Sequence, residues 1–373
     1  MHNIIISHEK PSDAAIMAHQ IKKSSEAFEP PISESFNCPQ IELFQEFLYN
    51  NAEQREKMSN AIPLWDCLPR YSMSRQAAHK MRKAETLPSL LNIPCQYLGQ
   101  NFVVQIQPAR IFDDNENVVE YYPSANEELI EDALRKIASL QNQGFFDEKR
   151  HRSGVTFTIY QLREELKKRG HTRSHKEIVL SLQILARSII EIKTENKKNK
   201  AFGISSYFRQ LSSVSRSDLI EDNKAKWYVE FHPLITQAIN EIDYRQYNYA
   251  QMMGHSTQIA RWLHKYLVIK FTCAELGKEF EVRFSTVKRD SGLLEAYGRN
   301  RDAMDALKKA FTELTNDEIL LSFNENRVIG SQGKVEDIVY TIFPTIKFSM
   351  EVKASNKRCV NTKSLLENMS KNR

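Results

Sequence analysis

The chain has 373 residues, of which 41% are hydrophobic and 10% aromatic, so it can build two or three packed domains and is not a disordered protein. Its 52 basic and 47 acidic residues leave a net charge of +5, an average too small to identify a partner, so the distribution of charge must do so. No apolar run approaches the roughly 18 residues that a membrane span needs, and the first residues lack the apolar stretch of a signal peptide, so we expect a cytoplasmic protein.

The first third of the chain carries few strong signals. Residues 1–62 are largely polar and broken by a Glu-Pro-Pro step, which predicts a flexible N-terminal arm with one short amphipathic helix near Ile41 to Asn50. Residues 63–124 contain the strand-like run NFVVQIQPARIF, a turn rich in Asp and Asn, and a second apolar run from Val118 to Tyr122. This pattern predicts a small β-containing platform with a hairpin.

Residues 125–232 are predicted to form a winged-helix domain, an α+β unit. A helix from about Asn126 to Asn142 has apolar residues at helical spacing and acids in its first turns, where the helix dipole favours them. A strand, a helix, a sharp turn, a second helix and another strand follow between Gly154 and Ile192, which is the order of a winged helix-turn-helix.

Both helices of this helix-turn-helix have a recognisable start. Thr158 with Gln161 can form a capping box for the first helix, and Ser174 with Glu177 can form one for the second. In the second helix an apolar stripe that includes Leu182 leaves the opposite side to solvent.

The exposed side of this second helix suits contact with base edges. Arginine and lysine pair with guanine, glutamine pairs with adenine, and leucine can contact a thymine methyl group. A solvated surface is the better interpretation for any single lysine, but six basic residues against two acids between Arg163 and Lys176 favour DNA for the group. The predicted contacts of this unit are Lys168, Arg169, Thr172, Arg173, Ser174, His175, Lys176, Leu180, Gln183, Arg187, Lys193, Lys197, Lys198, Lys200 and Arg209.

A basic wing is predicted after the second helix. A strand from Ile189 to Thr194 leads into the tip ENKKNK, and further strands are expected near Ile204 to Leu211 and Trp227 to Phe231. Between Lys193 and Lys226 the chain has eight basic and four acidic residues. We expect the three tip lysines to supply mainly sequence-independent affinity for phosphates.

Residues 233–350 are predicted to repeat this unit with an offset of about 127 to 130 residues. A helix from Ser256 to Lys270 takes the place of the earlier one, and Phe284-Ser285 matches Phe157-Thr158 as strand end and helix start. Two strands flanking a glycine-rich turn then predict a second wing. The predicted DNA contacts of this second winged-helix domain are Lys288, Arg289, Arg299, Asn300, Arg301, Lys309, Arg327 and Lys334.

Two acids complicate the second unit. Asp302 and Asp305 share the region of the second helix that should face DNA, where they would repel phosphate. Either this helix contacts few bases, or these acids pair with other residues of the protein. The remaining residues, 351–373, are polar and basic and are predicted to be a flexible tail.

Four runs together indicate a family: YYPSANEELIEDALRKIA, GVTFTIYQLREELKKRGHT, DYRQYNYAQMMGHSTQIARWLHKYL and RDSGLLEAYGRNRDAMDALKKAF. In these runs the chain resembles the replication initiator (Rep) proteins of iteron-containing bacterial plasmids, over about residues 121–343. The resemblance implies tandem winged-helix domains, binding to direct repeats at an origin in a bacterial cell, recruitment of the host initiator and replicative helicase, and a monomer–homodimer switch linked to autorepression.

The sequence contains no recognisable catalytic or metal-binding motif. A rolling-circle nickase would need a paired-histidine metal motif, and no HxH exists; GSQGKV is too short for a P-loop and lacks its hydroxyl. His171 and His175 have a turn between them and no third ligand, and the five cysteines are scattered without a CxxC pair. We therefore expect no enzyme activity, no cofactor and reduced thiols.

Two functions remain open at this point. One is a replication initiator that binds double-stranded origin DNA and opens it, and the other is a transcriptional regulator of tandem winged-helix type. Tandem direct repeats of about two helical turns beside the gene favour the initiator, whereas a lone operator palindrome favours the regulator.

Overall fold

The structure is a computed structural model. The expected wing-tip residues Lys197, Lys198 and Lys200 lie outside the residues that it describes. The described residues are 31–49, 51–113, 115–195, 201–214, 225–331 and 333–371.

The first winged-helix unit is present, with both predicted capping boxes. The Thr158 side chain caps its first helix and the Ser174 side chain caps its second, each paired with the expected Gln161 or Glu177. Its sheet has the order β10-β11-β7-β6, so the strand before the two helices pairs with the last strand of the wing. The elements are α6 (Ala125–Ala138), β6 (Gly144–Asp147), β7 (Arg152–Thr158), α7 (Ile159–Lys168), α8 (His175–Arg187), β10 (Phe208–Val214) and β11 (Lys226–Phe231).

The second unit repeats this arrangement. Its sheet has the order β13-β15-β14, so again the strand before the helices pairs with the last strand of the wing. The α+β class with tandem winged-helix units is thereby confirmed. The elements are α11 (Gln258–Lys270), β13 (Phe280–Arg283), α12 (Phe284–Ser291), α13 (Asn300–Asn316), β14 (Leu320–Ile329) and β15 (Val335–Pro344).

The predicted position of the first wing is wrong. The hairpin of β8 (Ile189–Thr194) and β9 (Phe202–Ser206) extends the sheet of β2 (Leu91–Tyr97) and β3 (Gln100–Gln107) in the order β2-β3-β8-β9. Apolar cross-strand pairs explain this, because Ile190 and Ile192 lie opposite Ile106 and Val104 of β3. The wing is instead the hairpin of β10 and β11, and the residues that join these strands, 215–224, lie outside the described part.

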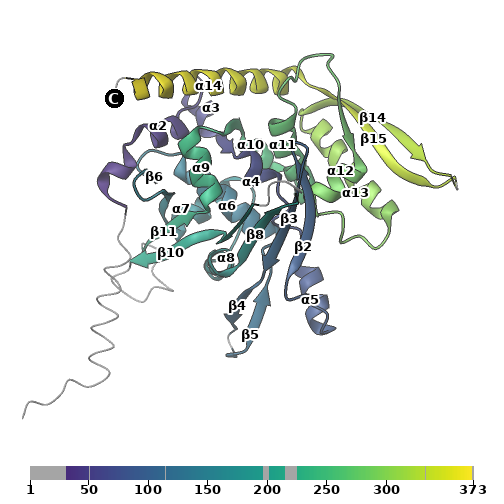
Figure 1. The fold of residues 1–373 in the computed structure, drawn as a ribbon, viewed down its shortest axis with the longest axis horizontal. Coiled ribbons are helices and arrows are strands. Elements are labelled where there is room, and N and C mark those ends of the chain that lie inside the picture. Colours follow the sequence, from purple (N-terminus) through teal and green to yellow (C-terminus); the bar gives the residue numbers. More distant parts are fainter. Residues whose placement is uncertain are drawn as a thin grey trace, which may run out of the picture.

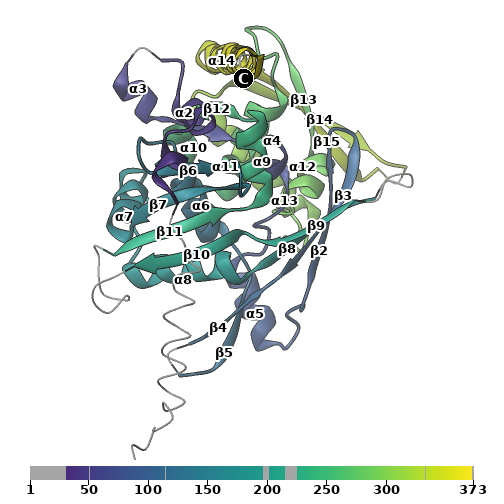
Figure 2. The same cartoon turned by 60° about the vertical axis from the view of Figure 1, so that its left-hand side comes forward.

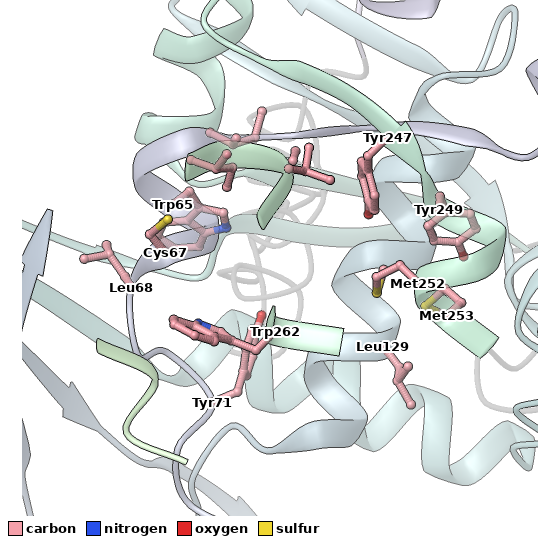
Figure 3. Close-up of a cluster of buried hydrophobic side chains, with 14 of the residues drawn as sticks. Trp65, Cys67, Leu68, Tyr71, Leu129, Tyr247, Tyr249, Met252, Met253 and Trp262 are labelled. Atoms are coloured by element: carbon pink, nitrogen blue, oxygen red, sulfur yellow. The ribbon is translucent and has the colours of Figure 1, made fainter. Parts of the chain in front are cut away.

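The expected platform, residues 63–124, shares one apolar core with the two winged-helix units. Its predicted hairpin is confirmed as β4 (Ala109–Phe112) paired with β5 (Val118–Tyr121). Figure 3 shows Trp65, Leu68 and Tyr71 of this region together with Tyr247 and Trp262 of the second half of the chain, and one buried apolar cluster joins them. The platform also contains α4 (Pro63–Cys67) and α5 (Arg75–Lys83).

The described part of the N-terminal arm is packed, contrary to the prediction of a flexible segment. Ile41 and Phe44 are buried in the main apolar cluster. The strand β1 pairs with β12, so residues almost 200 positions apart form one small sheet. The elements are η1 (Ser33–Phe36), α2 (Pro39–Gln45), α3 (Ala52–Glu56), β1 (Met58–Ala61) and, from the second half, β12 (Arg245–Asn248).

The C-terminal tail was predicted to be flexible, and this too is wrong. It forms α14 (Ile346–Lys371), which runs along the edge of the molecule opposite α5 and the β4–β5 hairpin (Figures 1 and 2). Arg358 is 4% exposed and donates to Asn60 Oδ1 at 2.6 Å and to the Leu43 carbonyl at 2.7 Å.

Among the described helices, α14 included, none is long and apolar enough to cross a membrane. Two further helices, α9 (Pro233–Glu241) and α10 (Tyr249–Gly254), link the two units.

Substitution of Leu182 tests how α8 packs on the core. Its side chain is wholly buried beneath the helix, so Leu182→Ala is expected to leave a cavity and lower the free energy of unfolding by about 2 to 5 kcal/mol. Urea denaturation measures this. Lys176→Ala on the exposed side of the same helix is the matched control and should leave the midpoint unchanged. An unchanged midpoint for Leu182→Ala would contradict the packing described here.

Candidate nucleic-acid interface

Helix α8 lies between two hairpins, with β10 on one side and β4 on the other. Leu180 and Ile184 pack against Ala109, Ile111 and Tyr121 of the β4–β5 hairpin. The predicted contact between Leu180 and a thymine methyl group therefore does not fit, because the hairpin covers this side of the helix. The sequence could not indicate this, since a leucine on a helix face gives no sign of which distant element covers it.

What α8 still presents is a narrower stripe, and Arg187 at its end donates from Nη1 to the carbonyl of Arg110 on β4 at 3.3 Å. Thr172, Lys176 and Arg187 are exposed, and Gln183 is half-buried. Gln183 and Arg187 line a groove with Arg209 and Gln210 of β10. This stripe can offer a lysine, a glutamine and an arginine to base edges along one line of the helix.

The beginning of α8 is fixed to the neighbouring helix α6. Arg173 donates from Nη2 to Asn126 Oδ1 at 2.8 Å and from Nη1 to the carbonyl of Thr172 at 2.8 Å. Ser174 is the N-cap, and its hydroxyl donates to Glu177 Oε2 at 2.8 Å. His175, the first residue of the helix, is half-buried. Arg173 thus attaches the start of α8 to α6, whereas Lys176, one turn further on, is exposed.

Arg169 is not placed for contact with DNA. Its side chain is 7% exposed, donates to Glu165 Oε1 at 2.9 Å and lies over the ring of Tyr249 at 5.4 Å. Burial would lower the pKa of this guanidinium, but Glu165 raises it above the ordinary value. Arg169 also donates to Glu56, and Lys168 beside it is more exposed and pairs with the same Glu56 at 3.0 Å. Both cations therefore attach the helix-turn-helix to the N-terminal region, which the prediction missed.

The strand residues predicted as contacts are exposed but paired. Lys193 on β8 pairs with Glu191 at 2.9 Å, and Arg209 on β10 pairs with Glu230 at 3.3 Å. Burial raises the pKa of Glu230. Of these two cations, Arg209 lies in the groove beside α8 and Lys193 does not. Arg209 is therefore closer to the predicted recognition helix.

The second unit presents a mixed surface on α13. Arg299, Asn300, Arg301 and Lys309 are exposed, as are Arg327 on β14 and Lys334 at the turn of the second wing. Asp302 and Asp305 are exposed as well and line a groove with Lys309. Their exposure favours the alternative in which α13 contacts few bases.

Two predicted residues on α12 have local partners. Lys288 donates to Asn300 Oδ1 at 3.1 Å, which joins the two helices of the second unit. Arg289 makes two bonds to the carboxylate of Asp290, at 2.7 and 3.0 Å, and Asp290 also accepts from the backbone N–H of Gln96 at 2.8 Å. Arg289 thus supports the contact between α12 and β2, and it is not placed as a free phosphate ligand.

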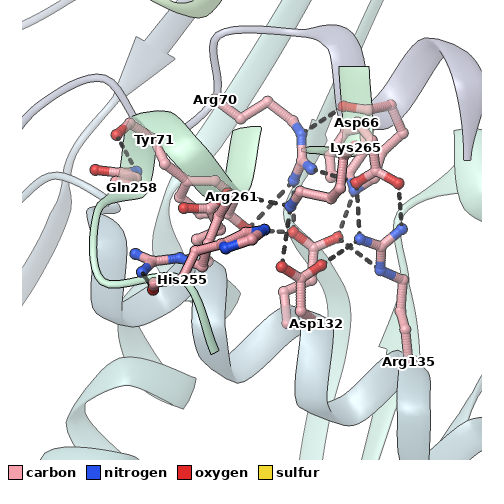
Figure 4. A network of polar contacts seen from close by, with 12 residues as sticks. Asp66, Arg70, Tyr71, Asp132, Arg135, His255, Gln258, Arg261 and Lys265 are labelled. Atoms are coloured by element: carbon pink, nitrogen blue, oxygen red, sulfur yellow. Dashed lines mark hydrogen bonds and ion pairs between the residues drawn. The ribbon is translucent and has the colours of Figure 1, made fainter. Parts of the chain in front are cut away.

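A buried ion network, which the sequence analysis missed, joins the two units (Figure 4). Lys265 of α11 donates to Glu128 at 3.1 Å and to Asp132 at 2.9 Å, both on α6. Arg135 of α6 makes two bonds to Asp66 of α4, at 2.8 and 2.7 Å. These side chains are at most 5% exposed. The possible signal was the charged series Glu128, Asp132 and Arg135, which recurs at helical spacing on α6.

Burial and ion pairing act in opposite directions on the pKa values of this network. Burial would raise the pKa of the Asp66 carboxyl, but Arg135 and Lys265 hold that pKa below its usual value. Burial would lower the pKa of Lys265, but Asp132 and Glu128 raise it. The pKa of Asp132 is raised, chiefly by burial. The first helices of the two units are therefore tied by charged groups, which fixes α8 and α13 relative to each other.

Metal binding has one candidate among the described residues, the group of His255, Glu313 and Asp317. His255 Nδ1 lies 2.7 Å from Asp317 Oδ2 within the group, whereas His255 Nε2 lies 2.9 Å from His264 Nδ1 and Glu313 accepts from Thr257 Oγ1 at 2.9 Å. His171, considered above for zinc, lies 2.8 Å from the carbonyl of Met253 through Nε2. Neither arrangement resembles an open metal site.

Comparisons with known proteins give distant likenesses only. No family model matches the chain, and no curated protein matches it. Two crystal structures of domains 2 and 3 of RctB align with TM-scores of 0.44 and 0.43 at 11% and 9% identity, covering 69% and 72% of this chain and 91% and 95% of theirs. The Pi initiator protein in complex with iteron DNA aligns with a TM-score of 0.39 at 12% identity, over 59% of this chain and 94% of that one. Similarity at this level carries no argument about function, so the functional proposal depends on the residues themselves.

Proposed function

We propose that this protein binds double-stranded DNA in a sequence-specific manner and acts as a replication initiator at direct repeats. The observation that carries the proposal is the stripe of exposed Lys176 and Arg187 and half-buried Gln183 on α8, the second helix of a winged helix-turn-helix. This is the helix that such domains place in the major groove, and these side-chain types discriminate guanine and adenine there.

The arrangement of the two units supports a long site without two-fold symmetry. Because the Lys265 and Arg135 networks tie α6, α11 and α4 together, α8 and α13 belong to one body. Their surfaces differ, since α13 carries Asp302 and Asp305 where α8 carries no acid on its exposed stripe. One copy of the protein would therefore recognise a directed sequence, strongly through α8 and weakly through α13, and such a sequence suits direct repeats.

The initiator role goes beyond DNA binding and is supported by the sequence resemblance to plasmid Rep proteins. Under this role, several copies bind in the same orientation at an origin, and the complex recruits the host initiator and the replicative helicase. The alternative, a tandem winged-helix transcriptional regulator, would use the same stripe on α8, and the symmetry of the site distinguishes the two.

Selection of duplexes from a randomised pool, followed by footprinting, tests the proposal. We expect enrichment of one directed site of about two helical turns, roughly 20 base pairs, with the strongest sequence preference in one half. An enriched palindrome of equal halves would favour the regulator. Failure to enrich any sequence over the starting pool would contradict sequence-specific binding.

A further inference from the structure

The geometry points to a third DNA contact, made by α5 to the phosphate backbone of the segment between the parts of the site that α8 and α13 occupy. This inference rests on the proposed function and adds a surface that the sequence analysis did not identify. The occupant is the sugar–phosphate backbone of the same duplex, not a base sequence.

The charge of α5 is the first observation. Its nine residues, Arg75–Lys83, include four arginines and lysines and no acid. Gln76, His79, Lys80 and Lys83 recur at helical spacing and are all exposed, whereas Ala78 is buried against the body. The helix therefore presents one polar, basic stripe to solvent.

The other two cations of α5, Arg75 and Arg82, have protein partners that anchor the helix. Arg75 Nη2 donates to Glu127 Oε1 at 2.8 Å on α6 and to Ser181 Oγ at 3.4 Å on α8. Arg82 donates to the backbone carbonyl of Glu120, and its guanidinium lies 5.5 Å from the ring centre of Tyr121. With both ends attached, the outer stripe has a fixed direction.

The position of α5 connects the two recognition helices. Its beginning contacts α8 through Arg75, and Ser74 and Gln76 line the same groove as Asp302, Asp305 and Lys309 of α13. Figures 1 and 2 place α5 and α8 on the side of the molecule opposite α14. A duplex that reaches both α8 and α13 would pass α5. The acids of α13 face the beginning of α5, so the phosphate contacts should come from Lys80 and Lys83 further along.

A purely structural role is the competing explanation. Cations in the last turn of a helix offset its dipole, and three of the four cations, Lys80, Arg82 and Lys83, lie there. This role predicts a loss of stability on substitution, whereas phosphate contact predicts a change in the salt dependence of binding.

The test compares Lys80→Ala/Lys83→Ala with the wild type and with Lys357→Ala/Lys363→Ala, a matched pair of exposed lysines on α14. The probes are the duplex selected by the wild type and a mixed-sequence duplex. We expect the α5 variant to bind both more weakly, to keep its sequence preference, and to lose roughly 1.8 units of the slope of log affinity against log salt, at about 0.9 for each contact. The control variant should keep the wild-type slope, and thermal melts of all three proteins should coincide.

A second probe locates the contact. The selected duplex is made with neutral methylphosphonates in the segment between the two footprinted parts, which should weaken the wild type and leave the α5 variant unaffected. An unchanged salt slope for the α5 variant would overturn the α5 contact, and so would equal sensitivity of both proteins to the methylphosphonates. In either case a retained sequence preference still supports the proposed function. If the wild type binds neither duplex, both proposals are wrong.

Discussion

Replacing Arg135 with methionine is expected to lower the free energy of unfolding by about 3 to 5 kcal/mol. The substitution keeps a long apolar side chain but removes both bonds to Asp66 and leaves that buried carboxylate without its main partner. A buried charge without compensation costs far more than a lost surface interaction. Urea denaturation followed by circular dichroism measures the change.

An exposed pair provides the matched control for this experiment. Arg110 and Glu120 pair at 2.9 Å on the β4–β5 hairpin, but the Arg110 side chain is 69% exposed. Arg110→Met should therefore cost at most about 1 kcal/mol. Equal effects for the two arginines would contradict the assignment of Arg135 to a buried network.

The largest effect on DNA binding is expected from Lys176→Ala combined with Gln183→Ala. Each side chain is expected to contribute about 1 to 3 kcal/mol of discrimination, so the pair should cost roughly 2 to 6 kcal/mol on the selected duplex. That corresponds to a loss of affinity of roughly 30-fold to 20,000-fold. The two positions are two helical turns apart, about 10 Å, so their effects should add.

Specificity distinguishes this result from general weakening. The double variant should bind a mixed-sequence duplex with an affinity much closer to that of the wild type, and a repeated selection should show relaxed preference in one half of the site. Lys357→Ala on α14 is the control and should leave both affinities unchanged. Should the double variant retain the wild-type sequence preference, α8 does not read bases.

The sequence predicts the local parts of this fold well. The capping boxes at Thr158 and Ser174 depend on residues three positions apart, so their chemistry is visible in the sequence and both are present. The repeat also identifies the second unit, because its sheet and helices follow the same order along the chain. These features need only the spacing of neighbouring residues.

The errors come from pairings between distant residues. The β8–β9 hairpin was assigned to the wing because it follows α8 directly, but Val104 and Ile106, more than 80 positions earlier, provide its apolar partners. Leu180 was assigned to DNA because the approach of the β4–β5 hairpin is not encoded in α8 itself. In α14 the buried side chains include Ser355, Arg358 and Thr362, so its polar sequence hid a packed helix. The basic helix α5 is an exception, because its Ser74 cap and its acid-free sequence RQAAHKMRK are local signals.

The bonds of Arg358 have a consequence for synthesis on the ribosome. This side chain satisfies Asn60 and the carbonyl of Leu43, which precede it by 298 and 315 positions. At translation rates of about 5 to 20 residues per second, Asn60 would wait roughly 15 to 60 s for this partner to be made. During that interval Asn60 and the carbonyl of Leu43 lack the guanidinium to which they bond in the folded protein. This part of the N-terminal region therefore completes its hydrogen bonds only after α14 has been made.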